Sequence, residues 1–183
     1  MTILTKSPPA TFIHIPKTGG NSVRTWLLDN VPKSRAMFQH SFMKDHAPYS
    51  YIKKAIKDDR GLVFAVVRNP WSRVVSAYHY HKQRDRQGNY VTFDQFVELD
   101  MRAASRPQHL YVDQSVTILK LEQIEQDFKQ IQDYFKCYID LPVLNKSKHT
   151  HYSNYYNDHT KQIVADKFKR DIELYKYQYE QLI

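Results

Sequence analysis

The strongest constraint on the fold is the order of segments between residues 12 and 28: a short apolar run, a glycine-containing loop, and a helix-like segment. Pro16 ends the apolar run, which is typical of a β-strand. The loop consists of Lys17, Thr18, Gly19, Gly20, Asn21 and Ser22. Adjacent glycines let the backbone approach an anion without a Cβ in the way, and the first turn of the next helix points its N–H groups at that anion. This order predicts a phosphate-binding loop, in which Lys17 adds a point charge and the hydroxyl groups add donors.

The position of Lys17 distinguishes this loop from the common nucleotide-binding pattern GxxxxGK[ST], in which the lysine follows the glycines and a hydroxyl binds magnesium. In this chain the lysine comes before the glycines. Taken alone, the loop is equally compatible with phosphate binding and with a glycine-rich turn between a strand and a helix. A second segment of the chain favours phosphate binding.

The second segment is a continuous apolar run over residues 62–67, typical of a strand buried on both faces of a parallel sheet. Arg68 follows it, and Pro70 suits the first position of a helix because its missing N–H is not needed there. One face of this helix is formed by Trp71, Val74, Val75 and Tyr78. Arg68 is therefore predicted at the carboxyl end of a central strand, where ligands of open α/β sheets bind and where a guanidinium can grip a phosphate with two hydrogen bonds. A salt bridge to a carboxylate is the alternative for Arg68.

The two segments together resemble motifs of the carbohydrate (Golgi-type) sulfotransferases, nearest to the heparan sulfate 2-O-sulfotransferase-like branch and its bacterial relatives. Residues 14–22 are similar to the 5′-phosphosulfate loop of that family. Residues 67–78 are similar to its 3′-phosphate motif. Weaker similarity over residues 92–96, 119–122 and 144–147 extends the resemblance to most of the chain.

The resemblance implies the donor 3′-phosphoadenosine 5′-phosphosulfate (PAPS). It also implies an α/β, P-loop-like three-layer fold with a central parallel sheet flanked by helices, as a single domain over residues 1–183. By motif position, the 5′ phosphate and sulfuryl group would be held by Lys17, Thr18, Gly19, Gly20, Asn21 and Ser22. Arg68 and Ser76 would hold the 3′ phosphate, although a helix serine bonded to its own backbone is the simpler interpretation of Ser76 alone. Ser147 matches a segment that closes over the nucleotide. Asn21 departs from the more usual threonine but retains hydrogen-bonding ability.

Sulfuryl transfer to an alcohol needs a base for the acceptor hydroxyl and stabilisation of the departing phosphate. Lys17 is the candidate for stabilising the departing phosphate. Histidine is the natural base because its ordinary pKa lies near 6.5. We predict His46, which lies between the two phosphate motifs, where the resembling family places its catalytic histidine. His40 is the alternative base, and a surface position without a catalytic role is the alternative for either histidine. His14 is expected to orient the loop.

The net charge indicates the kind of partner. A formal charge of +8 favours anionic ligands, namely the donor and an acidic acceptor such as a glycan or a glycolipid. The chain has 14 tyrosines and 27 basic residues, but they match no nucleic-acid-binding signature, so no nucleic-acid partner is expected. The segments 82–89 and 145–157 are long enough to contact an acceptor, but nothing in them identifies it. The oligomeric state is not indicated either.

Length and composition limit the class of protein. A chain of 183 residues with 42% hydrophobic residues suits one domain with a single core and excludes a disordered class. No stretch approaches the roughly 18 apolar residues of a membrane span, and no signal sequence opens the chain. The single cysteine, Cys137, permits no internal disulfide and suits a reducing compartment. These features predict a soluble, cytoplasmic microbial or viral enzyme.

Three alternatives were considered for the chemistry. A structural metal site is not expected, because the nine histidines and one cysteine form no ligand pattern: His79 and His81, for example, would face different ways on a helix. A phosphoryl-transferring P-loop kinase would prefer ATP with magnesium. A non-catalytic binding module would hold the nucleotide without turnover, and a sulfate-transfer assay distinguishes it from an enzyme.

The remaining segments are predicted from their periodicity. Residues 91–101 form a helix that begins with an N-cap threonine. Residues 116–121 form a third strand, and an apolar stripe over residues 124–135 follows as a helix. The final helix begins with Asp158 or His159 as its cap.

Overall fold

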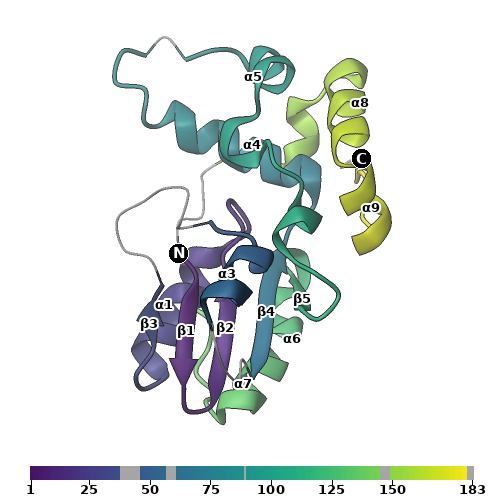
Figure 1. Cartoon of the computed structure of the whole chain (residues 1–183). Coiled ribbons are helices and arrows are strands. Elements are labelled where there is room, and N and C mark those ends of the chain that lie inside the picture. The colour runs from purple at the N-terminus through teal and green to yellow at the C-terminus, as the bar shows by residue number, and fades with distance from the viewer. Residues whose placement is uncertain (38–45, 57–60, 89, 145–148, 181–183) are drawn as a thin grey trace. The chain divides into compact units, whose positions relative to one another are not determined.

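The computed structural model describes residues 1–37, 46–56, 61–88, 90–144 and 149–180 (Figure 1). The chain divides into two compact units. The sheet unit comprises residues 1–67 and 108–145, and the helical unit comprises residues 68–107 and 146–183. The single domain over the whole chain stays a prediction.

The sheet unit contains five strands: β1 (Ile3–Lys6), β2 (Pro9–Ile13), β3 (Arg35–Ala36), β4 (Leu62–Val67) and β5 (Thr117–Lys120). Their order is β3-β1-β2-β4-β5, with β2, β4 and β5 parallel and β1 antiparallel to both of its neighbours. Ile13 pairs with Ala65, and Val67 pairs with Lys120. The carboxyl ends of the three parallel strands therefore meet at one edge of the sheet.

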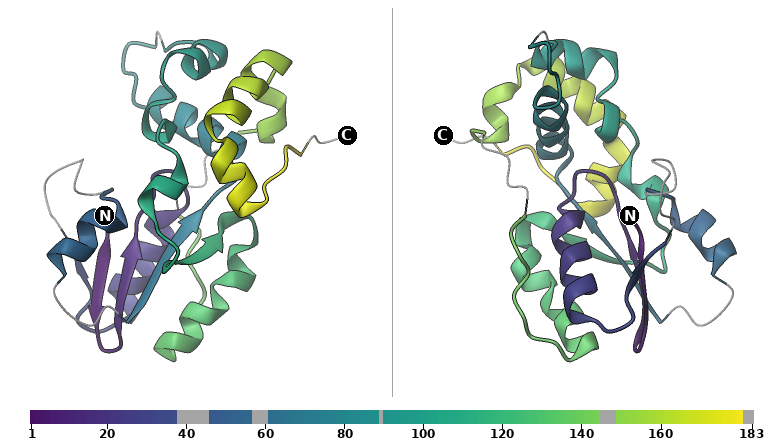
Figure 2. Two further views of the ribbon diagram at one scale, coloured as in Figure 1. Left: turned by 45° about the vertical axis from the view of Figure 1, so that its right-hand side comes forward. Right: turned by 90° about the vertical axis from the view of Figure 1, so that its left-hand side faces the viewer.

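Helices cover the sheet of this unit. They are α1 (Gly20–Asn30), α3 (Tyr49–Ala55), α6 (Ile124–Asp127) and α7 (Lys129–Phe135), with short 3₁₀ turns η2 (Gln108–Tyr111) and η3 (Leu121–Gln123). Figure 2 shows α1, α6 and α7 on one face and α3 on the other. The core under α1 and α6–α7 is formed by Phe12, Phe64, Val66 and Leu119 of the sheet with Trp26, Leu27, Phe128 and Ile131 of the helices. The predicted α/β architecture, a sheet with a parallel centre flanked by helices, is confirmed.

The helical unit consists of α4 (Pro70–Lys82), α5 (Phe93–Leu99), η1 (Arg102–Ala104), η4 (Tyr152–Tyr155), α8 (Asp158–Lys167) and α9 (Lys169–Tyr175). Its core combines the apolar faces of α4, α5 and α8, with Val74, Val75, Phe96, Met101, Val164 and Phe168 fully or almost fully buried. Within the described residues, no helix of either unit is long and apolar enough to cross a membrane.

The last helix and the helix over residues 124–135 differ from their predictions. The last helix begins one residue earlier than predicted, because the side chain of Asn157 accepts a hydrogen bond from the Thr160 N–H at 2.9 Å and so takes the N-cap position. It is also interrupted at Phe168, whose φ of −110° and ψ of 19° separate α8 from α9. The predicted helix over residues 124–135 is likewise divided at Phe128 into α6 and α7.

Candidate active site

The predicted anion loop lies at the carboxyl edge of the sheet, between β2 and α1. Gly19 precedes α1 with a φ of +79°, a conformation that favours glycine. A Cβ on Gly19 would lie 2.7 Å from Cδ1 of Leu121, and a Cβ on Gly20 would lie 2.1 Å from Cδ2 of His14. The backbone of the loop thus passes between a leucine and an imidazole ring, and both contacts leave no room for a side chain.

The polar side chains of the loop have different environments. Thr18 is fully buried, and its hydroxyl donates to the carbonyl of Ile15 at 3.0 Å, which closes the loop on itself. Ser22 accepts a hydrogen bond from the backbone N–H of Leu144 at 3.2 Å. Because that bond uses a lone pair of the hydroxyl oxygen, the hydroxyl hydrogen of Ser22 can still be donated. Asn21 is exposed, and Lys17 is partly exposed with a left-handed φ of 68°.

The electrostatic environment of the loop is positive. Burial holds the pKa of the His14 imidazole well below its usual 6.5, and the N-terminal amino group, His46, Arg24 and Lys17 lower it further. Within the described residues, the charges that shift this pKa are thus all on groups that are cationic or become so on protonation. A site with this potential attracts anions.

His14 gives the folded protein a specific pH dependence. Because folding lowers its pKa, the unfolded chain binds a proton below about pH 6.5 that the folded chain does not, so the free energy of unfolding should fall on acidification. The variant His14→Phe keeps an aromatic ring beside Gly20. Between pH 7 and 5, its free energy of unfolding should depend less steeply on pH than that of the wild type, by up to about 1.4 kcal/mol per pH unit. Urea unfolding of both proteins at several pH values measures it. Parallel pH profiles would contradict a buried, neutral His14.

His46 is joined to the start of the loop. Its Nδ1 lies 2.9 Å from the backbone carbonyl oxygen of His14, and the two imidazole rings meet edge to face with centroids 4.7 Å apart. A carbonyl oxygen can only accept, so Nδ1 of His46 carries the hydrogen. In the neutral imidazole this leaves the lone pair on Nε2, the atom that can take up a proton. The alternative base, His40, lies outside the described residues.

The second predicted motif begins the helical unit. Arg68 follows β4 directly, and its Nε donates to Oγ of Ser72 at 3.0 Å. The side chain of Asn69 accepts from the N–H groups of Trp71 and Ser72 and so caps α4. Ser76 lies one helical turn beyond Ser72, on the same face of α4, and is largely buried. The guanidinium of Arg68 is therefore held against the face of α4 that carries both serines.

The structure groups the predicted residues in two sets. The loop, Lys17 and His46 belong to the sheet unit, whereas Arg68 and Ser76 belong to the helical unit. Ser147 lies outside the described residues. The described part of the chain contains no group of three or more histidine, cysteine or acidic side chains that could hold a metal ion.

Sequence reasoning missed three contributions to the loop. Leu121, the first residue of η3 after β5, lies against Gly19, and the N–H of Leu144 donates to Ser22. Both residues lie in segments of weaker family similarity, but that similarity does not indicate a contact with the loop. Arg24 lies four residues after Gly20 on α1 and influences His14. Only its i, i+4 spacing from Gly20 could have drawn attention to it.

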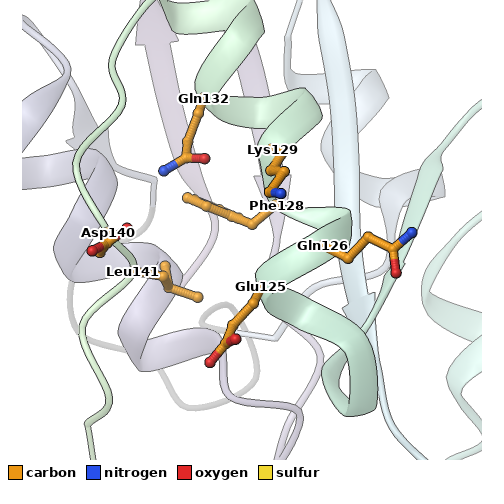
Figure 3. A pocket seen from close by; sticks show the side chains of 7 residues that line it. All are labelled: Glu125, Gln126, Phe128, Lys129, Gln132, Asp140 and Leu141. Carbon is orange, nitrogen blue, oxygen red and sulfur yellow. The ribbon is translucent and has the colours of Figure 1, made fainter.

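A separate pocket of about 730 Å³ lies elsewhere on the sheet unit (Figure 3). It is lined by Glu125, Gln126, Phe128, Lys129, Gln132, Asp140 and Leu141. Its wall comes from α6, α7 and the segment after α7, and it includes none of the predicted site residues. The pocket therefore forms no part of the candidate site.

The α/β fold, the glycine loop and the positive potential define an anion-binding protein. The family model of the sulfotransferase domain matches residues 23–164, most of the chain, so the protein belongs to the sulfotransferase domain family. The matched segment includes His46, Arg68 and Ser76 and begins directly after Ser22. No curated protein and no solved structure matches the chain.

Family membership decides between the functional classes considered above. The chain is a PAPS-dependent sulfotransferase, an enzyme that transfers a sulfuryl group to an acceptor. The family match therefore favours the sulfotransferase over the alternatives of a P-loop kinase and a non-catalytic binding module.

Proposed function

We propose that the acceptor is a carbohydrate hydroxyl, that the enzyme belongs to the heparan sulfate 2-O-sulfotransferase-like branch, and that His46 is the general base. The observation that carries the proposal is the hydrogen bond from Nδ1 of His46 to the carbonyl of His14, directly before the anion loop. This bond joins a histidine of defined tautomer to the loop. The net charge of +8 supports an acidic acceptor, such as a glycan that already carries carboxylate or sulfate groups.

The loop is proposed to hold the 5′ end of the donor. Its oxygens would accept from the backbone N–H groups at the start of α1, from the ammonium of Lys17 and from the hydroxyl of Ser22. The exposed Asn21 adds an amide donor, and the buried hydroxyl of Thr18 keeps the loop closed. Arg68 and Ser76 are proposed to hold the 3′ phosphate, and Ser147 to contribute to nucleotide binding.

When bound, PAPS supplies the sulfuryl group, and the bond between this group and the 5′ phosphate is the one that breaks. Nε2 of His46 takes the proton of the acceptor hydroxyl while the hydroxyl oxygen forms its new bond to sulfur. Lys17 neutralises the charge that develops on the oxygen of the departing phosphate, which leaves with the bonding electron pair. No metal ion is required for either task.

A transfer assay with radiolabelled PAPS tests the acceptor class. Desulfated and partly sulfated heparan-type oligosaccharides are compared with neutral sugars, a glycolipid, simple alcohols and phenols. Transfer to the acidic oligosaccharides at the highest kcat/KM supports the proposal. Preferred transfer to phenols or simple alcohols would overturn the carbohydrate assignment, although the chain would remain a sulfotransferase.

Replacing Arg68 tests the 3′-phosphate role. Arg68→Ala should weaken the binding of adenosine 3′,5′-bisphosphate by about ten- to a hundred-fold, because a charge-assisted, bidentate contact is lost. Adenosine 5′-phosphate, which lacks the 3′ phosphate, should bind the variant and the wild type almost equally. Calorimetric dissociation constants measure both. The exposed Arg170 of α9 provides the control variant Arg170→Ala. If Arg68→Ala weakened the binding of both nucleotides equally, this would contradict the proposed role of Arg68 at the 3′ phosphate.

A further inference from the structure

Arg24 carries one of several buried side-chain atoms that have no hydrogen-bond partner among the described residues, its Nε. A buried guanidinium N–H without an acceptor is costly, because it has lost its water and gained nothing in exchange. Natural proteins retain such a group where a ligand satisfies it or where it has another task.

The position of Arg24 directs attention to the anion loop. It lies one helical turn after Gly20 on the same face of α1, and side chains of a helix lean toward its N-terminus, here toward the loop. The place of a side chain on Gly20 is taken by the ring of His14. Arg24 is close enough to this ring to lower the pKa of His14, as Lys17 also is. Arg24 therefore extends from the face of α1 on which Gly20 packs against His14.

We propose that Arg24 is a second cationic ligand of the 5′ phosphosulfate end of the donor, acting beside Lys17. The inference rests on the proposed role of the loop. A tetrahedral oxyanion offers several acceptor oxygens, and a guanidinium can satisfy two of them at once with parallel N–H donors. Arg24 is assigned to the 5′ end because it shares α1 with the loop, whereas Arg68 and Ser76 belong to the other unit.

Arg24→Met tests this assignment, because methionine keeps an unbranched apolar stem and removes every N–H. Adenosine 3′,5′-bisphosphate should bind the variant about ten- to a hundred-fold more weakly than the wild type. Adenosine 3′-phosphate, which lacks the 5′ phosphate, should bind both proteins almost equally. The affinity of Arg24→Lys for the bisphosphate should lie between those of the wild type and Arg24→Met, since lysine keeps the charge and loses the paired donors. Arg35→Met, at an exposed arginine of β3, controls for the lost charge.

The melting temperature without ligand separates ligand binding from a structural role. Removing an unsatisfied buried N–H should leave this temperature unchanged or raise it. A lower melting temperature together with equal weakening of both nucleotides would overturn the inference in favour of a structural role. Unchanged affinity of Arg24→Met for the bisphosphate would also overturn it.

The same measurements distinguish this inference from the proposed function. If the wild type binds the bisphosphate and transfers sulfate while Arg24→Met binds it equally well, only the assignment of Arg24 fails. If the wild type itself shows no affinity for the bisphosphate at millimolar concentration, the proposed role of the loop fails, and the inference about Arg24 fails with it.

Discussion

His46→Asn should lose sulfuryl transfer by about 10²- to 10⁴-fold, the usual contribution of a general base. The amide nitrogen of asparagine can take the place of Nδ1 and keep the hydrogen bond to the carbonyl of His14, but asparagine offers no atom that accepts a proton at neutral pH. Nucleotide affinity should therefore be nearly unchanged. Initial rates with radiolabelled PAPS and calorimetric affinity for adenosine 3′,5′-bisphosphate measure the two effects separately.

A matched control for this substitution is His159→Asn, at an exposed histidine in the first turn of α8. It should have the rate of the wild type. If His46→Asn transfers sulfate at the wild-type rate, the base is another group, and His40 is the next residue to replace.

Lys17→Met should lower kcat by about 10²- to 10³-fold, comparable with the loss of one charge-stabilising donor at a developing oxyanion. Methionine keeps the unbranched stem and removes the ammonium. If Lys17 acts chiefly on the departing phosphate, kcat and kcat/KM should fall together. Steady-state kinetics with varied PAPS concentration measure both quantities.

The control for Lys17 is Lys6→Met, at an exposed lysine that ends β1. This change also removes one positive charge from the sheet unit and should leave both kinetic constants unchanged. A Lys17→Met enzyme with a higher KM and an unchanged kcat would show that the ammonium binds the donor equally in the ground and transition states. That result would contradict a role in stabilising the leaving group.

The two strand–helix junctions were predictable from the sequence because their signals are local. The apolar runs before Pro16 and Arg68, the paired glycines and the first-turn Pro70 each restrict a few neighbouring residues. The structure confirms β2, β4, α1 and α4 at these positions. Parallel pairing of β2 with β4 follows from the crossover between them.

The edge of the sheet and the breaks in the helices were not predictable in this way. β3 has two residues, too few for a recognisable period, and both β1 and β3 are defined by their pairing. The apolar stripes of α6–α7 and α8–α9 continue across Phe128 and Phe168, so periodicity alone indicated one helix in each case.

The site likewise combines residues that the sequence indicates with contacts that only the tertiary structure reveals. Lys17 and the two glycines could be selected from the sequence, but the packing of Gly20 on His14 and the unsatisfied Nε of Arg24 are tertiary facts. The bond from His46 to the carbonyl of His14 joins residues 32 positions apart. The acceptor and the cytoplasmic location stay predictions.

The contacts of the anion loop have a consequence for biosynthesis. Gly19 packs on Leu121, and the hydroxyl of Ser22 receives the N–H of Leu144, 122 positions further along the chain. The indole of Trp26 donates to the carbonyl of Ile139, 113 positions away. A nascent chain of about one hundred residues thus contains the loop sequence but not yet Leu121 and Leu144, which contact the loop. The contacts around the anion loop can therefore be completed only after residue 144 has been synthesised.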